Sequence, residues 1–130
     1  GEVIAEGMIS LGLTLDAAQR ERRISELLRR VHLEPELSQR FPHEFSGGQL
    51  QRIAIARALA VEPELIICDE VFSGLSMSEI ASMVPLIERL QMDGITLIMI
   101  EHRLRELFQM NGNPFGIFQR FNKVEVNLLS

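Results

Sequence analysis

The sequence predicts an α/β protein, with a helical subdomain followed by a parallel strand-helix-strand portion and a C-terminal hairpin. Two short apolar runs, ELIIC at 64–68 and ITLIMI at 95–100, have the composition of strands buried on both faces. A helical pattern separates them, and helical periodicity also dominates the residues before Pro63. We therefore expect a helical domain over residues 1–62 and a sheet-containing domain over 63–130.

Composition limits the function classes. The chain of 130 residues has a formal net charge of −5 and a pI of about 5.2, so we expect no nucleic-acid partner. No apolar run reaches the roughly 18 residues of a membrane-spanning helix, and no signal-peptide pattern opens the chain. These features predict a cytoplasmic protein. A single cysteine, Cys68, excludes a disulfide framework and is expected to be a reduced core thiol.

The helical region contains one strong amphipathic pattern. Residues 1–15 are read as a short helix and a loop, and the segment 16–33 then has a capping box between Asp16 and Gln19. Its apolar face consists of Ile24, Leu27, Leu28 and Val31. The arginines of this helix are expected to form a solvated face rather than a binding patch. His32 and His43 lack partners at ligand spacing and are expected to be structural.

A second helix is predicted to begin with two glycines. Ser46, Gly47, Gly48 and Gln49 have the spacing of a capping box, and Leu50, Ile53, Ala54 and Leu59 are expected to form the apolar face that follows. Glycines in a first helical turn allow another molecule to approach N–H groups at the positive end of the helix dipole. The pattern indicates an anion site, most plausibly for phosphate. A capped helix with incidental glycines remains the alternative.

Two acids follow the first predicted strand. Asp69 and Glu70 stand at its carboxyl end, where open α/β sheets bind ligands. Because neighbouring strand residues point in opposite directions, we expect separate roles. One carboxylate is suited to Mg²⁺, and the other to orienting and deprotonating a water. An acidic exit from a strand into a loop is the alternative.

The next elements complete the strand-helix-strand portion. Ser76 and Glu79 form a capping box, and Pro85 is expected to kink the helix or to shift its start. A turn at 93–94 leads to the second strand, which ends at Glu101 and His102. We expect the connection to be right-handed, which places His102 at the same sheet edge as the two acids. A helix over about 103–110 and a hairpin over 116–129 are predicted to follow.

These motifs, in this order, resemble those of the ATP-binding-cassette ATPases. The resemblance implies a P-loop nucleotidase core and assigns a nucleotide-binding signature loop to Ser46, Gly47, Gly48 and Gln49. It also implies that Asp69 is the magnesium-associated Walker B acid, and that Glu70 and His102 are the catalytic base and the switch histidine. The D-loop would consist of Ser73, Gly74, Leu75 and Ser76.

The chain departs from that family in three ways. Ser76 stands where the family usually has aspartate, and Val71 stands where it commonly has proline. No Gly-x-x-x-x-Gly-Lys-Ser/Thr sequence is present, because the only lysine is Lys123 in the predicted hairpin. The Walker A portion is therefore absent from this sequence. We expect the isolated chain to bind ATP weakly or not at all, and to hydrolyse none.

The resemblance also implies partners. In the family two cassettes enclose ATP and Mg²⁺, so we expect a second cassette or a Walker A-containing half to complete the site. A transmembrane permease would hold the chain at the inner face of a membrane. Self-association is also expected, because the missing Walker A strand would leave one edge of the second strand unpaired.

Three functional hypotheses remain open. The first is a portion of the ATPase subunit of an importer of peptides or amino acids. The second is a non-catalytic interaction module, or an engineered chimera with a seam near residue 70, since residues 40–70 look like peptide importers and 71–108 like branched-chain amino-acid importers. The third is a cassette ATPase of DNA repair or chromosome maintenance. Such proteins insert long coiled coils before the signature, whereas about one amphipathic helix precedes it here, and the acidic pI also disfavours this class.

Overall fold

The computed structural model describes residues 1–10, 12 and 14–100, and the chain divides into two compact units, Gly1–Pro63 and Glu64–Ser130. Three of the predictions lie outside the described residues: the end of the second strand at Glu101 and His102, the helix over 103–110 and the hairpin over 116–129. No helix in the described part of the chain combines the length and the apolarity needed to cross a membrane.

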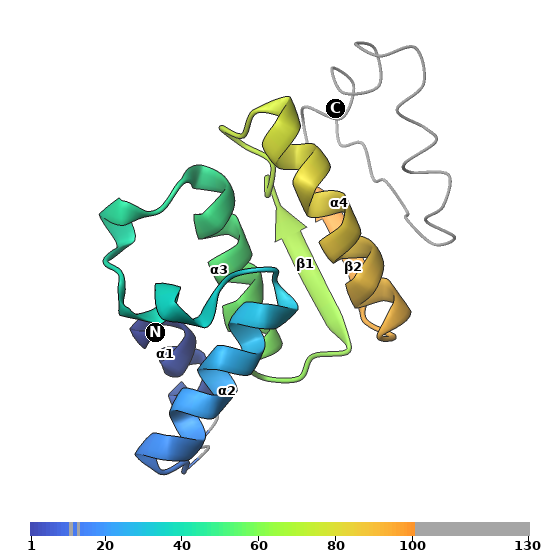
Figure 1. Ribbon diagram of the computed structural model, residues 1–130. Coiled ribbons are helices and arrows are strands. Elements are labelled where there is room, and N and C mark those ends of the chain that lie inside the picture. The colour runs from blue at the N-terminus through green and yellow to red at the C-terminus, as the bar shows by residue number, and fades with distance from the viewer. Residues whose placement is uncertain (11, 13, 101–130) are drawn as a thin grey trace. The chain divides into compact units, whose positions relative to one another are not determined.

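The first unit is helical. Three α-helices, α1 (Glu2–Ser10), α2 (Ala17–Arg30) and α3 (Gly47–Leu59), are joined in part by two 3₁₀ turns, η1 (Pro35–Gln39) and η2 (Pro42–Glu44) (Figure 1). Helix α3 contacts both α1 and α2. The core consists of apolar residues from all three helices and from the segments that follow α2 and α3: Ile4, Ala5, Met8, Ile24, Leu27, Leu28, Val31, Leu33, Ile55, Ala56, Leu59 and Ala60.

Helix α2 has defined signals at both ends. The capping box predicted between Asp16 and Gln19 is confirmed, and the predicted apolar face is buried. At the other end the N–H of Leu33 donates to the carbonyl of Leu28 over 2.9 Å, and the N–H of His32 donates to Arg29 over 3.0 Å. This is a Schellman motif, which needs a left-handed residue after the cap. His32 supplies it with φ of 58°, although glycine is the usual residue there.

Helix α3 buries only part of the predicted apolar face: Leu59 is buried and Ile53 is half-buried, but Leu50 and Ala54 are not buried. Its buried residues are Gly48, Arg52, Ile55, Ala56 and Leu59, whereas Leu50 is 44% exposed and Ala54 is exposed. The prediction failed for Leu50 and Ala54 because apolar residues occur on several sides of this helix, and it could not anticipate that an arginine would be buried. The packing of α3 against α1 also determines which face of α3 is buried. The two helices approach closely at Gly7 of α1, because a Cβ atom added there would lie 3.1 Å from the carbonyl oxygen of Arg57.

The described part of the second unit is a strand-helix-strand unit. Strands β1 (Leu65–Asp69) and β2 (Thr96–Ile100) pair in parallel, with Leu65 opposite Thr96 and Asp69 opposite Ile100. Helix α4 (Met77–Met92) connects them and begins at the predicted capping box. Pro85 lies within α4 and does not shift its start. The α/β class and the parallel pairing are confirmed.

The strands are buried on one face rather than on both. Ile66, Leu97 and Met99 are buried, whereas Leu65, Ile67 and Ile98 are 47%, 61% and 38% exposed. The expectation of burial on both faces is therefore wrong for the described residues. Helix α4 packs against β2, and a single helix covers only one face of a two-stranded sheet.

Candidate functional site

The start of α3 is a capped helix terminus that opens with two glycines. The N–H of Gln49 donates to Oγ of Ser46 over 3.2 Å, and the N–H of Ser46 donates to Oε1 of Gln49 over 3.0 Å. The box therefore occupies the amide of Gln49, whereas the amides of Gly47 and Gly48 belong to a first turn that has no intrahelical acceptors. Gly47 is exposed, and this geometry suits an oxyanion that approaches along the helix axis.

A short 3₁₀ turn, η2, leads into that helix. In η2 the N–H of Phe41 donates to Oε2 of Glu44 over 2.7 Å. The rings of Phe41 and His43 stack with centroids 5.9 Å apart and planes 8° apart, although Phe41 is 67% exposed. This ring pair was not predicted from the sequence. In the sequence, the only sign of this contact is that Phe41 and His43 stand two residues apart, with Pro42 between them. The contact itself depends on the turn, which brings the two rings together.

The two acids stand at the carboxyl end of β1. Asp69 is the last residue of the strand and Glu70 follows it, and both are exposed. Glu70 has φ of 50°, a left-handed backbone that is uncommon for a residue with a side chain. Such strain is often found at functional sites. The N–H of Glu70 donates to the carbonyl of Ile100 over 2.8 Å, which anchors this backbone to the end of β2.

The loop after Glu70 is compact. The N–H of Ser73 donates to the carbonyl of Glu70 over 2.9 Å, and Gly74 is left-handed with φ of 72°. Leu75 is buried and Ser76 caps α4, with Oγ accepting from the N–H of Glu79 over 3.3 Å. Serine at position 76 is therefore a competent helix cap, as aspartate would be.

The predicted site residues fall into two groups. Ser46, Gly47, Gly48 and Gln49 lie together in the first unit, and Asp69, Glu70 and the turn at 73–76 lie together in the second. His102 lies outside the described residues. Within residues 1–10, 12 and 14–100, no group of three or more His, Cys, Asp or Glu side chains is arranged to hold a metal ion. Mg²⁺ often uses only one or two protein carboxylates together with water and phosphate oxygens, so a single exposed carboxylate such as that of Asp69 is compatible with such an ion.

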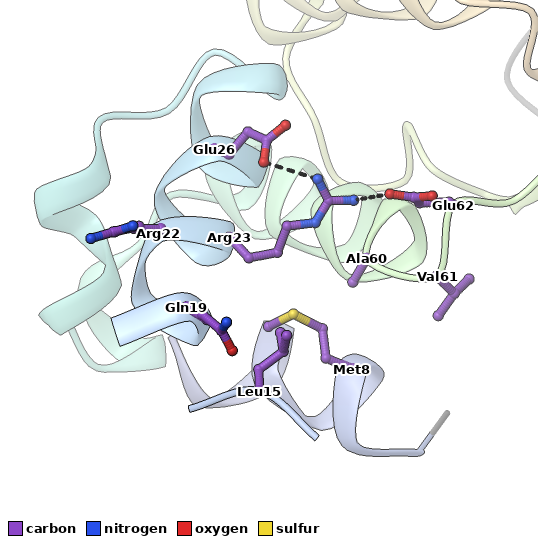
Figure 2. Close-up of a pocket in the computed structure, with 9 residues that line it drawn as sticks. All are labelled: Met8, Leu15, Gln19, Arg22, Arg23, Glu26, Ala60, Val61 and Glu62. Carbon is purple, nitrogen blue, oxygen red and sulfur yellow. Dashed lines mark hydrogen bonds and ion pairs between the residues drawn. The ribbon is translucent and has the colours of Figure 1, made fainter. Parts of the chain in front are cut away.

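A cavity of about 530 Å³ lies elsewhere in the first unit and contains none of the predicted site residues. Met8 and Leu15 form part of its apolar lining, and Arg23 lies beside it (Figure 2). The guanidinium of Arg23 pairs with Glu26 over 2.9 Å and with Glu62 over 2.7 Å. The cavity is lined by two arginines, Arg22 and Arg23, and two glutamates, Glu26 and Glu62, so the formal charges of its lining sum to zero.

Three comparisons with known proteins agree on the family. Residues 3–73 match the family model described as ABC transporter. The oligopeptide transport ATP-binding protein OppF of Haemophilus influenzae is 48% identical over 105 residues, which cover 80% of this chain and 32% of that protein. The nickel import ATP-binding protein NikE of Brucella abortus is 53% identical over 93 residues, which cover 71% of this chain and 35% of that protein.

The structural comparison gives the same result. The dimeric structure of MJ0796, a bacterial ABC transporter cassette, superposes with a TM-score of 0.65 at 30% identity, over 79% of this chain and 45% of that one. A post-hydrolysis dimer of MJ0796 with ADP and phosphate matches equally well, with a TM-score of 0.65. The chain spans about a third of the length of the curated relatives that it matches. The family match, the sequence identity and the shared fold together establish that this chain belongs to the ABC transporter family.

Proposed function

We propose that the chain is a portion of the ATP-binding and ATP-hydrolysing subunit of an ABC importer, and that it supplies the signature loop, the Walker B acids and the switch histidine. The observation that carries the proposal is the start of α3, where the Ser46 and Gln49 box leaves the amides of Gly47 and Gly48 without intrahelical acceptors and Gly47 is exposed. The left-handed Glu70 beside Asp69 supports it independently.

The proposed cofactors are ATP and Mg²⁺. The nucleotide would supply the phosphoryl group and the free energy of its hydrolysis. Asp69 is suited to hold the metal ion directly or through water, and Glu70 to orient and deprotonate the attacking water. The amides of Gly47 and Gly48 would bind phosphate oxygens, and His102 would form a hydrogen bond with a phosphate.

The proposed assembly requires partners. The signature loop would act on nucleotide held by a second cassette, whereas Asp69 and Glu70 would serve the Walker A loop of their own subunit. We propose that a transmembrane permease positions the assembly at the cytoplasmic face of a membrane. The MJ0796 cassette is described as a dimer, which supports the pairing of two cassettes.

A peptide is the solute that we propose. OppF is named for oligopeptide transport and NikE for nickel import, and both match a large part of this chain. The branched-chain amino-acid character of residues 71–108 keeps an amino-acid solute as the alternative. The 105 residues that match OppF of Haemophilus influenzae make up 80% of this chain, so the matched stretch extends across position 70. A chimera with a seam at that position is therefore not required to explain the match.

Calorimetry with magnesium-ATP tests the proposal on the chain alone and on the chain mixed with a Walker A-containing half of an oligopeptide importer cassette. We expect binding and turnover only in the mixture. Turnover above background by the pure chain, or no binding in either sample, would contradict the proposal. The second result would favour a non-catalytic module that retains the cassette fold.

Ser46→Ala provides a residue-level test of the same mixture. Loss of the cap should destabilise the chain by about 1 kcal/mol, and nucleotide affinity should also fall because the first turn of α3 frays. Asp16→Ala is the matched control, since it removes an equivalent capping box from α2. It should cost similar stability and leave nucleotide affinity unchanged. Equal affinity losses in both variants would mean that the start of α3 has no specific role.

A further inference from the structure

Arg52 is the one charged side chain that is buried among the described residues. It lies on α3 and is only 9% exposed. Its Nη1 atom donates to the backbone carbonyl of Val31 over 3.0 Å. Burying a guanidinium is costly unless the group is hydrogen-bonded, and burial lowers the pKa of Arg52 from its ordinary value. The side chain is therefore committed to this position.

The acceptor stands at the end of another helix. Val31 is the C-terminal cap residue of α2, and the Schellman motif uses the carbonyls of Leu28 and Arg29. The last carbonyls of a helix lack intrahelical donors and carry the negative end of its dipole. A cation that donates to Val31 satisfies one of these carbonyls and faces a favourable field. Arg52 thus ties α3 to the end of α2.

The hydrogen bond between Arg52 and Val31 lies one helical turn from the two glycines at the start of α3. Gly48 and Arg52 are four residues apart, and both belong to the buried face of the helix. Rotation of α3 about its axis would break the bond between Arg52 and Val31. It would also change the direction of the amides at the start of the helix, which lie one turn before Arg52. The far end of α3 is held separately, because the carbonyl of Arg57 lies close to Gly7 of α1.

We infer that Arg52 is the positioning residue of the signature loop: by donating to Val31 it holds α3 in the rotation that buries Gly48 and leaves the first turn exposed to phosphate at Gly47. The inference rests on the proposed function for the role of the first-turn amides. The hydrogen bond between Arg52 and Val31 lies within this chain, so its effect on the start of α3 can be tested without nucleotide.

Amide hydrogen exchange on the ¹⁵N-labelled full chain provides that test. The amides of Gln49 and Leu50 donate to Ser46 at the start of α3, and the amide of Leu59 reports on its last turn. In Arg52→Met, exchange at Gln49 and Leu50 should rise about tenfold relative to Leu59. Arg52→Lys should restore most of the protection, because lysine retains a charged donor. Arg57→Met removes an exposed arginine from the same helix and should change neither ratio.

The outcomes separate this inference from the proposed function. A uniform change along α3, or a lysine variant that behaves like methionine, would overturn the positioning role. In the mixture with a Walker A-containing half, Arg52→Met should raise the KM for ATP at least as strongly as it lowers kcat. Unaltered exchange together with lost turnover would also overturn the inference. If the wild-type mixture shows no turnover, the proposed function fails, and the exchange ratios still decide whether Arg52 positions the loop.

Discussion

The backbone N–H of Glu70 donates to the carbonyl of Ile100 over 2.8 Å, one residue beyond the last strand pair of Asp69 and Ile100. This bond extends the ladder past β1 while Glu70 itself adopts a left-handed backbone. The side chain of Glu70, the proposed general base, is therefore attached to a backbone whose position is fixed by a hydrogen bond to β2. The arrangement fits a group that must be oriented before a water can attack.

Glu70→Gln tests the role of that side chain. In the mixture with a Walker A-containing half, turnover should fall by about 100-fold or more, because a positioned general base contributes about that factor. Affinity for magnesium-ATP should be retained. Glu64→Gln is the matched control, since Glu64 is an exposed acid at the other end of β1. Equal rates for wild type and Glu70→Gln would remove Glu70 from the mechanism.

His32→Gly should stabilise the chain. His32 holds φ of 58° in the Schellman motif after α2, where glycine avoids the clash between Cβ and the backbone. We expect the free energy of unfolding in urea to rise by about 0.5–1 kcal/mol. Glu62→Gly relieves a similar φ of 50° but also removes the ion pair with Arg23, so its gain should be smaller. A destabilised His32→Gly would mean that the imidazole makes a contact that outweighs the backbone strain.

The exposed face of the sheet should promote association. Ile67 and Ile98 are opposite each other in the parallel pair and are 61% and 38% exposed. Ile67→Thr retains a β-branched side chain and removes apolar area, so sedimentation should show a dissociation constant for self-association raised by about tenfold. Met92→Thr is the control, because Met92 is 79% exposed at the end of α4. Equal effects of the two variants would place the contact surface elsewhere.

Cys68 should make stability fall at alkaline pH. Partial burial raises the pKa of this thiol in the folded chain, because the protein interior disfavours the thiolate. The stabilisation is complete below the ordinary thiol pKa of about 8.5 and is lost as the pH rises through the raised value. Urea unfolding between neutral pH and about pH 10 should show this loss in wild type relative to Cys68→Ala. Parallel profiles for the two proteins would refute it.

Local signals in the sequence were sufficient for several parts of the fold. The capping boxes at Asp16, Ser46 and Ser76 involve residues three apart, so their partners are determined by the helix geometry alone. The apolar face of α2 was predicted correctly for the same reason. The start of α3, with its glycines, was placed by these local rules as well.

The helix starts, the α/β class, the order of the motifs and the family resemblance could all be predicted before the fold was known, because they depend on neighbouring residues and on short-range periodicity. Three features could not be predicted in this way: α3 buries Arg52 instead of Leu50, the strands expose Ile67 and Ile98, and Glu70 adopts a left-handed backbone bonded to Ile100. Each of these features depends on partners distant in the sequence, at the end of α2, across the sheet or in the neighbouring strand. Local periodicity contains no information about which distant group satisfies a buried cation or covers an apolar face.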